Sequence, residues 1–245
     1  MSIPTFLEAA QRRGAQCVQI GDNFPVQHLS QNALSDIRAQ ADELGLEIEI
    51  GMRGLVFDEV LRHIEIATSL GSSILRIVID SETCHPSFDT VIKTIEGGLP
   101  TLSRQGIKLA IENHDRFAVD QYVSIVRNTD PHWVGICLDS VNSMGSGAGF
   151  YEVAHQLIPI TINAHIKDYQ IKRKEHQMGF DVTGTVAGQG MLPIPWLLDE
   201  LKGTGICQSA ILELWPEPEA NLQSTIEKEA RWAQESMLYL KHILG

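Results

Sequence analysis

The sequence lacks the patterns that mark several protein classes. Its four cysteines (Cys17, Cys84, Cys137 and Cys207) lie far apart, and no CxxC spacing of the kind that holds a metal is present. Three of them fall in or beside apolar runs, where cysteine acts as a small hydrophobic residue. No apolar run approaches the length of a membrane span, and no segment has a signal-peptide pattern. We therefore expect a cytoplasmic protein with reduced thiols and no membrane partner.

Basic residues are also scarce. The chain has 19 Lys and Arg against 31 Asp and Glu, a formal net charge of -12. Nucleic acids and anionic membranes favour basic surfaces, so neither is expected as the main partner. There are no repeats, low-complexity segments or linkers. The 245 residues suit one TIM-barrel domain over 1–245, because a (β/α)₈ barrel needs about 250 residues.

Short apolar runs alternate with longer amphipathic ones, which indicates βα units and a parallel sheet. Seven strands are expected: CVQIGD from Cys17, EIEIGMRG from Glu47, ILRIVID from Ile74, KLAIENHD from Lys108, VGICLD from Val134, TINAHIKD from Thr161 and SAILELWP from Ser209. Eight helices are expected around them. The chain opens on a helix where a barrel opens on a strand. Either the first strand is missing, or the start site lies further upstream, or the barrel closes unconventionally.

Capping residues predict where several helices begin and end. Ser30 is a typical N-cap for a helix that runs to Leu44, with Gly45 just beyond its end. Other helices are expected over 58–70, from Pro86 to before Gly106, and over 220–244. The segment 169–190 differs from the rest, because it is polar, rich in glycine and contains KRK. It predicts a lid or a mobile loop.

Polar residues share one face of the late strands. Because side chains alternate along a strand, one phase points to the helices and the other into the barrel. Leu109 and Ile111 occupy the first phase in their strand. The second phase carries a chemically distinct set near the strand ends: Glu112, Asp139, His165 and Glu213. Barrel enzymes place their chemistry at the C-terminal ends of the strands, so these four residues are candidate site residues.

Three inward carboxylates and one imidazole indicate a divalent cation, since a buried unpaired carboxylate is costly. This ligand set suits Mn²⁺, Co²⁺ or Mg²⁺, with Zn²⁺ as a further candidate. Taken singly, Asp139 is equally explained as a cap of the following turn, and His165 as a hydrogen-bonded core residue. Four independent strands that agree in phase, position and residue type favour the metal site.

Inward cations accompany these carboxylates. Arg53, Arg76 and Lys167 fall on the inward phase, where they either bind a substrate carboxylate or phosphate or neutralise nearby acidic residues. Lys167 is the strongest candidate for a substrate contact. Asn113 and His114 are candidates to orient the ligands. Trp215 fits either stacking on a sugar or packing at the rim.

These motifs together resemble the xylose isomerase-like TIM-barrel superfamily, also called the sugar phosphate isomerase/epimerase family. The resemblance rests on IENH at Glu112, CLDSVN at Asp139, AHIKD at His165, ILEL at Glu213 and GQG at 188–190, and it covers nearly the whole chain. It implies that Glu112 and Glu213 match the two glutamates with which ketose epimerases exchange the substrate proton.

Two positions depart from the epimerase pattern. Asn142 stands where those enzymes usually carry a histidine, three residues after the aspartate ligand. It joins Lys167, Arg76, Arg53 and His114 as a candidate substrate-binding residue. The epimerases also use an arginine shortly after the histidine ligand, and only Arg173 lies nearby here.

The leading hypothesis is an isomerase or epimerase that moves a proton on a small keto-sugar or sugar acid through an enediolate, with Glu112 and Glu213 as acid and base. The alternative is a metal-dependent lyase, a decarboxylase or dehydratase, acting on a 3-oxo sugar acid. A repair nuclease is disfavoured by the acidic charge and by Asn142. A non-catalytic sugar-binding barrel is the fourth hypothesis. A homo-oligomer is compatible with each of them.

Overall fold

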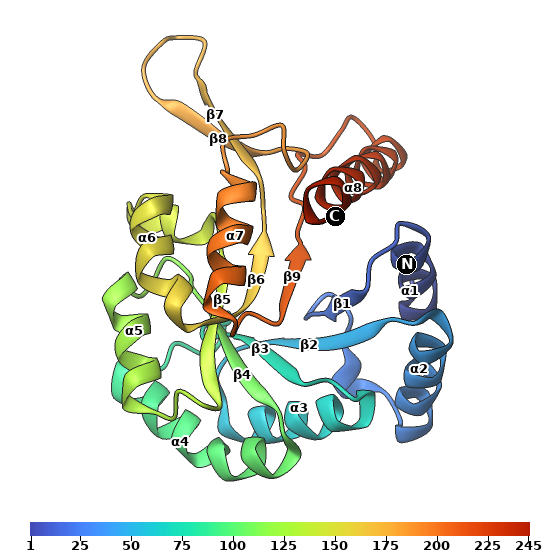
Figure 1. Ribbon diagram of the computed structural model, residues 1–245, viewed down its shortest axis with the longest axis vertical. Coiled ribbons are helices and arrows are strands. Elements are labelled where there is room, and N and C mark those ends of the chain that lie inside the picture. Colours follow the sequence, from blue (N-terminus) through green and yellow to red (C-terminus); the bar gives the residue numbers. More distant parts are fainter.

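Seven parallel strands form the central sheet of the computed structural model, which describes residues 1–245. In spatial order they are β1 (Cys17–Ile20), β2 (Glu47–Arg53), β3 (Ile74–Val78), β4 (Lys108–Glu112), β5 (Val134–Asp139), β6 (Thr161–Ile166) and β9 (Ser209–Leu212). The sheet curves into a nearly closed barrel (Figure 1). The predicted α/β TIM-barrel fold is confirmed, as is the opening of the chain on a helix.

Eight α-helices surround the sheet (Figure 1). They are α1 (Ile3–Arg12), α2 (Gln31–Leu44), α3 (Phe57–Leu70), α4 (Phe88–Gln105), α5 (Val119–Asn128), α6 (Phe150–Leu157), α7 (Ile194–Thr204) and α8 (Leu222–Leu244). Short 3₁₀ turns follow β1 (Val26–His28), β5 (Asn142–Ser146) and α6 (Ile158–Ile160). The main core lies between strands and helices and contains 49 buried residues. None of the helices combines the length and apolar character that a membrane span requires.

The helix ends follow the predicted capping residues. Ser30 Oγ accepts a hydrogen bond from the backbone N–H of Ala33, 3.3 Å away, at the start of α2. Gly45 and Gly71 end α2 and α3 in the left-handed region, at φ of 66° and 67°. The last helix begins slightly later than expected, because Asn221 caps it.

The segment 169–190 contains regular structure that the sequence analysis did not predict. It forms the antiparallel hairpin of β7 (Tyr169–Arg173) and β8 (Phe180–Gly184), which projects from the barrel (Figure 1). Ile171 pairs with Val182, and Gly179 turns the chain at a φ of 94°. The sequence analysis predicted a lid or a mobile loop here and named no strand, so these two strands are a correction to its strand count. The alternating β-branched and aromatic residues that favour strands were obscured by polar neighbours.

The barrel is open between β1 and β9, which stand at opposite ends of the strand order (Figure 1). A cavity of about 1270 Å³ lies there, bordered by residues of α1, α7 and α8. Gln19, Arg76, His165 and Glu213 all line it. The opening therefore connects the polar interior of the barrel with its surroundings.

Candidate metal centre

The four predicted ligands converge at the C-terminal end of the barrel. Glu112 and Asp139 are the last residues of β4 and β5, His165 lies near the end of β6, and Glu213 follows β9. Asp139 stands beside His165 in the register of the β5–β6 pair. Since the strands are parallel, their carboxyl ends meet at one rim, and this brings the four side chains together.

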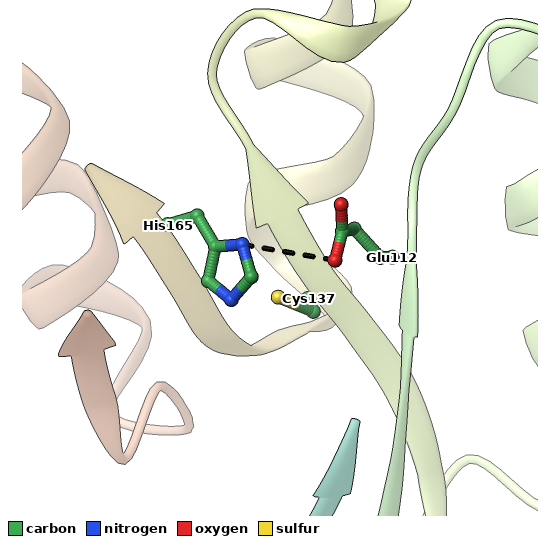
Figure 2. Close-up of side chains that lie close together, drawn as sticks. All are labelled: Glu112, Cys137 and His165. Atoms are coloured by element: carbon green, nitrogen blue, oxygen red, sulfur yellow. Dashed lines mark ion pairs between the residues drawn. The ribbon is translucent and has the colours of Figure 1, made fainter. Parts of the chain in front are cut away.

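One atom from each residue faces a shared centre. His165 Nδ1 lies 2.9 Å from Glu213 Oε2, 3.7 Å from Glu112 Oε2 and 3.8 Å from Asp139 Oδ2. Figure 2 shows the imidazole on β6 directed toward the Glu112 carboxylate. All four atoms are buried and none makes a regular hydrogen bond, so their polar contacts are ion pairs alone. Unsatisfied buried acceptors are costly, and a divalent cation would satisfy all four at once.

A thiol lies beside this centre. Cys137 precedes Asp139 on β5, and its Sγ faces both Glu112 and His165 (Figure 2). Because the residue is fully buried, its pKa is raised to about 11. A thiol binds metal as the thiolate, so Cys137 would have to lose its proton before it could join Glu112 and His165 as a ligand. Asp139, His165 and Glu213 form a second group whose ligand atoms all lie within 4.8 Å of one another.

Two cations lie among the carboxylates. Lys167 follows β6, and its Nζ is 2.9 Å from Asp139 Oδ2 and 3.2 Å from Glu213 Oε2. Arg76, on β3, places Nε 3.3 Å from Glu112 Oε2. Gly51 makes room for this arginine, since a Cβ at that position would lie 3.1 Å from the guanidinium carbon. Each candidate carboxylate ligand is thus paired with a basic group of the chain.

The pKa values follow from these contacts. Burial raises the pKa of Asp139 and of Glu213, but His165 and Lys167 outweigh it. The pKa of Asp139 is held well below its usual range, and that of Glu213 falls to about 2. Burial lowers the pKa of His165, yet the Asp139 and Glu213 carboxylates hold it well above 6.5. Without metal, these two carboxylates therefore favour the protonated ring.

This protonation predicts that metal binding releases a proton. At pH 7 both carboxylates are already ionised, whereas His165 must lose the proton on Nδ1 before that nitrogen can coordinate. We expect about one proton released per metal bound at pH 7, fewer as pH rises through the pKa of His165, and weaker binding as pH falls. Calorimetric titration in buffers of different ionisation enthalpy measures this number. Proton-neutral binding at pH 7 would contradict the assignment of His165.

The remaining oxygens of the carboxylates are held by the chain. Asn142 Nδ2 donates to Glu112 Oε1 at 2.7 Å. Asp139 Oδ1 accepts from the backbone N–H groups of Val141 and Asn142, both at 2.8 Å. Asn113 supports the same turn with both ends of its amide. Its Oδ1 accepts a hydrogen bond from Asp139 N at 2.7 Å. Its Nδ2 donates to the carbonyl of Asp139 at 3.0 Å and to Ser143 Oγ at 2.8 Å. These contacts orient the carboxylates toward the centre.

Asn113 allows a stability test of this support. The side chain is fully buried, so Asn113→Ala leaves the N–H of Asp139 without its acceptor in the interior. We expect unfolding free energy to fall by about 2 kcal/mol, the usual cost of an unsatisfied buried group plus a small cavity. Urea unfolding measures it. The exposed Asn32→Ala serves as the control, expected within about 0.5 kcal/mol of the wild type. Equal stability of both variants would argue against the role of Asn113.

Other predicted site residues lie outside the centre. Arg53 is at the rim, with Nε 3.4 Å from Asp22 Oδ2. The ring of His114 pairs with Asp115 at 2.6 Å. Trp215 donates from Nε1 to the carbonyl of Asp168 at 3.4 Å, at the base of the hairpin. Gln19 was missed by the sequence analysis. Its Oε1 lies 2.9 Å from His165 Nε2, and its place on the polar phase of β1 was the available signal.

Comparison with known families gives this arrangement its context. The family model described as xylose isomerase-like TIM barrel matches residues 7–242. The chain belongs to this family. Among curated proteins, a 3-oxo-isoapionate decarboxylase of Pectobacterium atrosepticum is 29% identical to this chain over 244 residues. The alignment covers 98% of this chain and 87% of the relative.

Solved structures share the xylose isomerase-like fold at low identity. A xylose isomerase-like TIM barrel protein from Mycobacterium smegmatis, in complex with magnesium, has a TM-score of 0.79 at 16% identity, covering 98% of this chain and 87% of that one. D-psicose 3-epimerase from Clostridium cellulolyticum H10, with D-tagatose, has a TM-score of 0.78 at 13% identity, covering 100% and 94%. A sugar epimerase is therefore among the structural neighbours of this chain, and a decarboxylase is among its curated relatives.

Proposed function

We propose that this chain catalyses the metal-dependent decarboxylation of a 3-oxo sugar acid. The observation that carries the proposal is the pair of cations, Lys167 and Arg76, set within the carboxylate cluster. An epimerase acting on a neutral ketose has no need of this positive charge. A substrate with its own carboxylate does need it.

The charge balance supports an anionic substrate. Glu112, Asp139 and Glu213 carry three negative charges, and Arg76 and Lys167 carry two positive ones. The net charge of these five groups is therefore -1. A bound divalent cation makes the net charge +1, which one substrate carboxylate would neutralise. Mg²⁺, Mn²⁺ or Co²⁺ suits the oxygen-rich ligand set, and Zn²⁺ is an alternative.

Similarity along the chain supports the same reaction class. The decarboxylase relative is matched over nearly the full length of this chain at 29% identity. The histidine usual in ketose epimerases is replaced by Asn142, which binds Glu112 Oε1. This position therefore departs from the epimerase pattern, and the amide of Asn142 has no titratable nitrogen of the kind that an imidazole offers.

The residues of the chain supply binding and the final proton. When bound, the metal would polarise the 3-keto oxygen and stabilise the negative charge of the enolate. Lys167 holds the carboxylate of the substrate. The bond between the α-carbon and that carboxylate breaks, CO₂ leaves, and the bonding electrons form the enolate. The Lys167 ammonium then faces the carbon that lost CO₂ and donates a proton to it, and solvent returns a proton to the amine.

An isomerase or epimerase is the second candidate, favoured by one observation. Glu112 and Glu213 approach the centre from strands that are far apart in the sheet order, as two proton-exchanging groups on opposite sides of a sugar require. Glu213 is, however, ion-paired with Lys167, and its pKa is lowered to about 2. This makes it a weak base in the metal-free state.

Product analysis in D₂O separates the two candidates. With metal and a 3-oxo sugar acid, we expect stoichiometric CO₂ and a ketose with one deuterium at the carbon that lost it. Deuterium in recovered substrate without CO₂ would support the isomerase instead. Neither product, with tight substrate binding, would support a sugar-binding barrel.

A further inference from the structure

Gln19 on β1 reaches across the barrel to the candidate metal ligand His165 on β6. Its Oε1 lies 2.9 Å from His165 Nε2 and 3.1 Å from Arg76 Nε. On its other side, Nε2 donates to Glu49 Oε2 at 3.0 Å and to Asn163 Oδ1 at 3.3 Å. One carboxamide thus connects the imidazole to a polar layer deeper in the barrel.

The orientation of this carboxamide is fixed from two sides. Arg76 Nε can only donate, since a guanidinium has no acceptor and stays protonated, so the atom facing it must be oxygen. Glu49, almost fully buried, presents carboxylate oxygens to the amide nitrogen and also accepts from Asn163 Nδ2 at 3.0 Å. Burial raises the pKa of Glu49, but the orientation does not depend on its ionisation, because Arg76 alone excludes the flipped amide.

The fixed oxygen determines which ring nitrogen of His165 carries hydrogen. A carbonyl oxygen accepts only, so Nε2 must donate to it. In the neutral ring, the lone pair is then on Nδ1. That atom lies 2.9 Å from Glu213 Oε2 and faces Asp139 and Glu112. The ring is thereby oriented with its coordinating nitrogen at the centre.

We propose that Gln19, held by Arg76 and Glu49, is a positioning residue that sets the tautomer and ring orientation of His165 for metal binding. The proposal rests on the metal site of the proposed function but is independent of which reaction that site performs. Arg76 then has two tasks, since it also pairs with Glu112.

Three variants test the proposal. Gln19→Leu removes the acceptor, and we expect it to weaken Zn²⁺ and Co²⁺ binding about 10- to 100-fold, the usual effect of losing the partner of a ligating histidine. Gln19→Glu keeps an oxygen facing both Arg76 and His165 but turns its second oxygen toward Glu49 Oε2, so it should weaken binding less than Gln19→Leu does. The exposed Gln105→Leu is the matched control and should bind as the wild type does. Thermal unfolding checks that each variant is folded.

The ring itself provides a second measurement. In the Zn²⁺-loaded protein labelled with ¹⁵N-histidine, NMR should show His165 protonated at Nε2 and coordinated through Nδ1. Gln19→Leu should lose this single form, and Gln19→Glu should retain it. Wild-type affinity in folded Gln19→Leu, or coordination through Nε2, would overturn the proposal, as would a wild-type protein that binds no metal. Intact metal binding without CO₂ release would reject the proposed reaction alone.

Discussion

Replacing His165 with alanine is expected to weaken binding of a divalent cation by at least about 100-fold, because it removes the only nitrogen ligand and leaves the carboxylates to bind alone. The side chain is buried, and its Nδ1 lies within 3.8 Å of one oxygen from each of the three candidate carboxylate ligands. No other residue of the cluster has a ring nitrogen to replace it.

Isothermal titration with Mn²⁺ and Co²⁺ measures the loss, and elemental analysis of the purified protein reports the metal that it carries. His28→Ala is the matched control, since His28 is exposed on a turn and should leave affinity unchanged. Equal metal content in the wild type and in His165→Ala would show that the cation binds elsewhere. Absence of any metal binding by the wild type would exclude the centre.

The alternation of side chains along strands was sufficient to predict the convergence of the candidate ligands. Glu112, Asp139 and Glu213 were each placed by the phase of one strand and by nearness to its end, both of which are local properties. The parallel order of the strands then determines where these ends meet. The same rule predicted His165, although the carboxylates that surround it in the structure lie dozens of positions away in the sequence.

Contacts across the barrel could not be predicted in this way. Gln19 and His165 are 146 positions apart, and only the curvature of the nearly closed sheet brings them within 2.9 Å. The same limit applies to Arg53, which shares its inward phase with the site but lies at the rim and pairs with Asp22. The alternation of side chains along a strand predicts which face of the sheet a residue occupies. Depth along the barrel axis depends on strand tilt and stagger, which a single sequence does not encode locally.

Replacing Lys167 with methionine is expected to lower the turnover number for decarboxylation about 10²- to 10⁴-fold, the range for loss of a positioned proton donor. Methionine keeps the apolar stem that packs in this largely buried position. The exposed Lys93→Met controls for loss of a lysine elsewhere and should leave turnover unchanged. Turnover of Lys167→Met within about 3-fold of the wild type would contradict the role of the ammonium.

Metal affinity distinguishes this role from a structural one. Lys167 Nζ lies 2.9 Å from Asp139 Oδ2 and 3.2 Å from Glu213 Oε2, so it competes with a divalent cation for the same oxygens. Its removal should leave metal binding equal or tighter while activity falls. Lys167→Arg retains the positive charge for the substrate carboxylate but is a poor proton donor, since arginine stays protonated. We therefore expect near-normal KM with low kcat in Lys167→Arg, and a rise in KM as well in Lys167→Met.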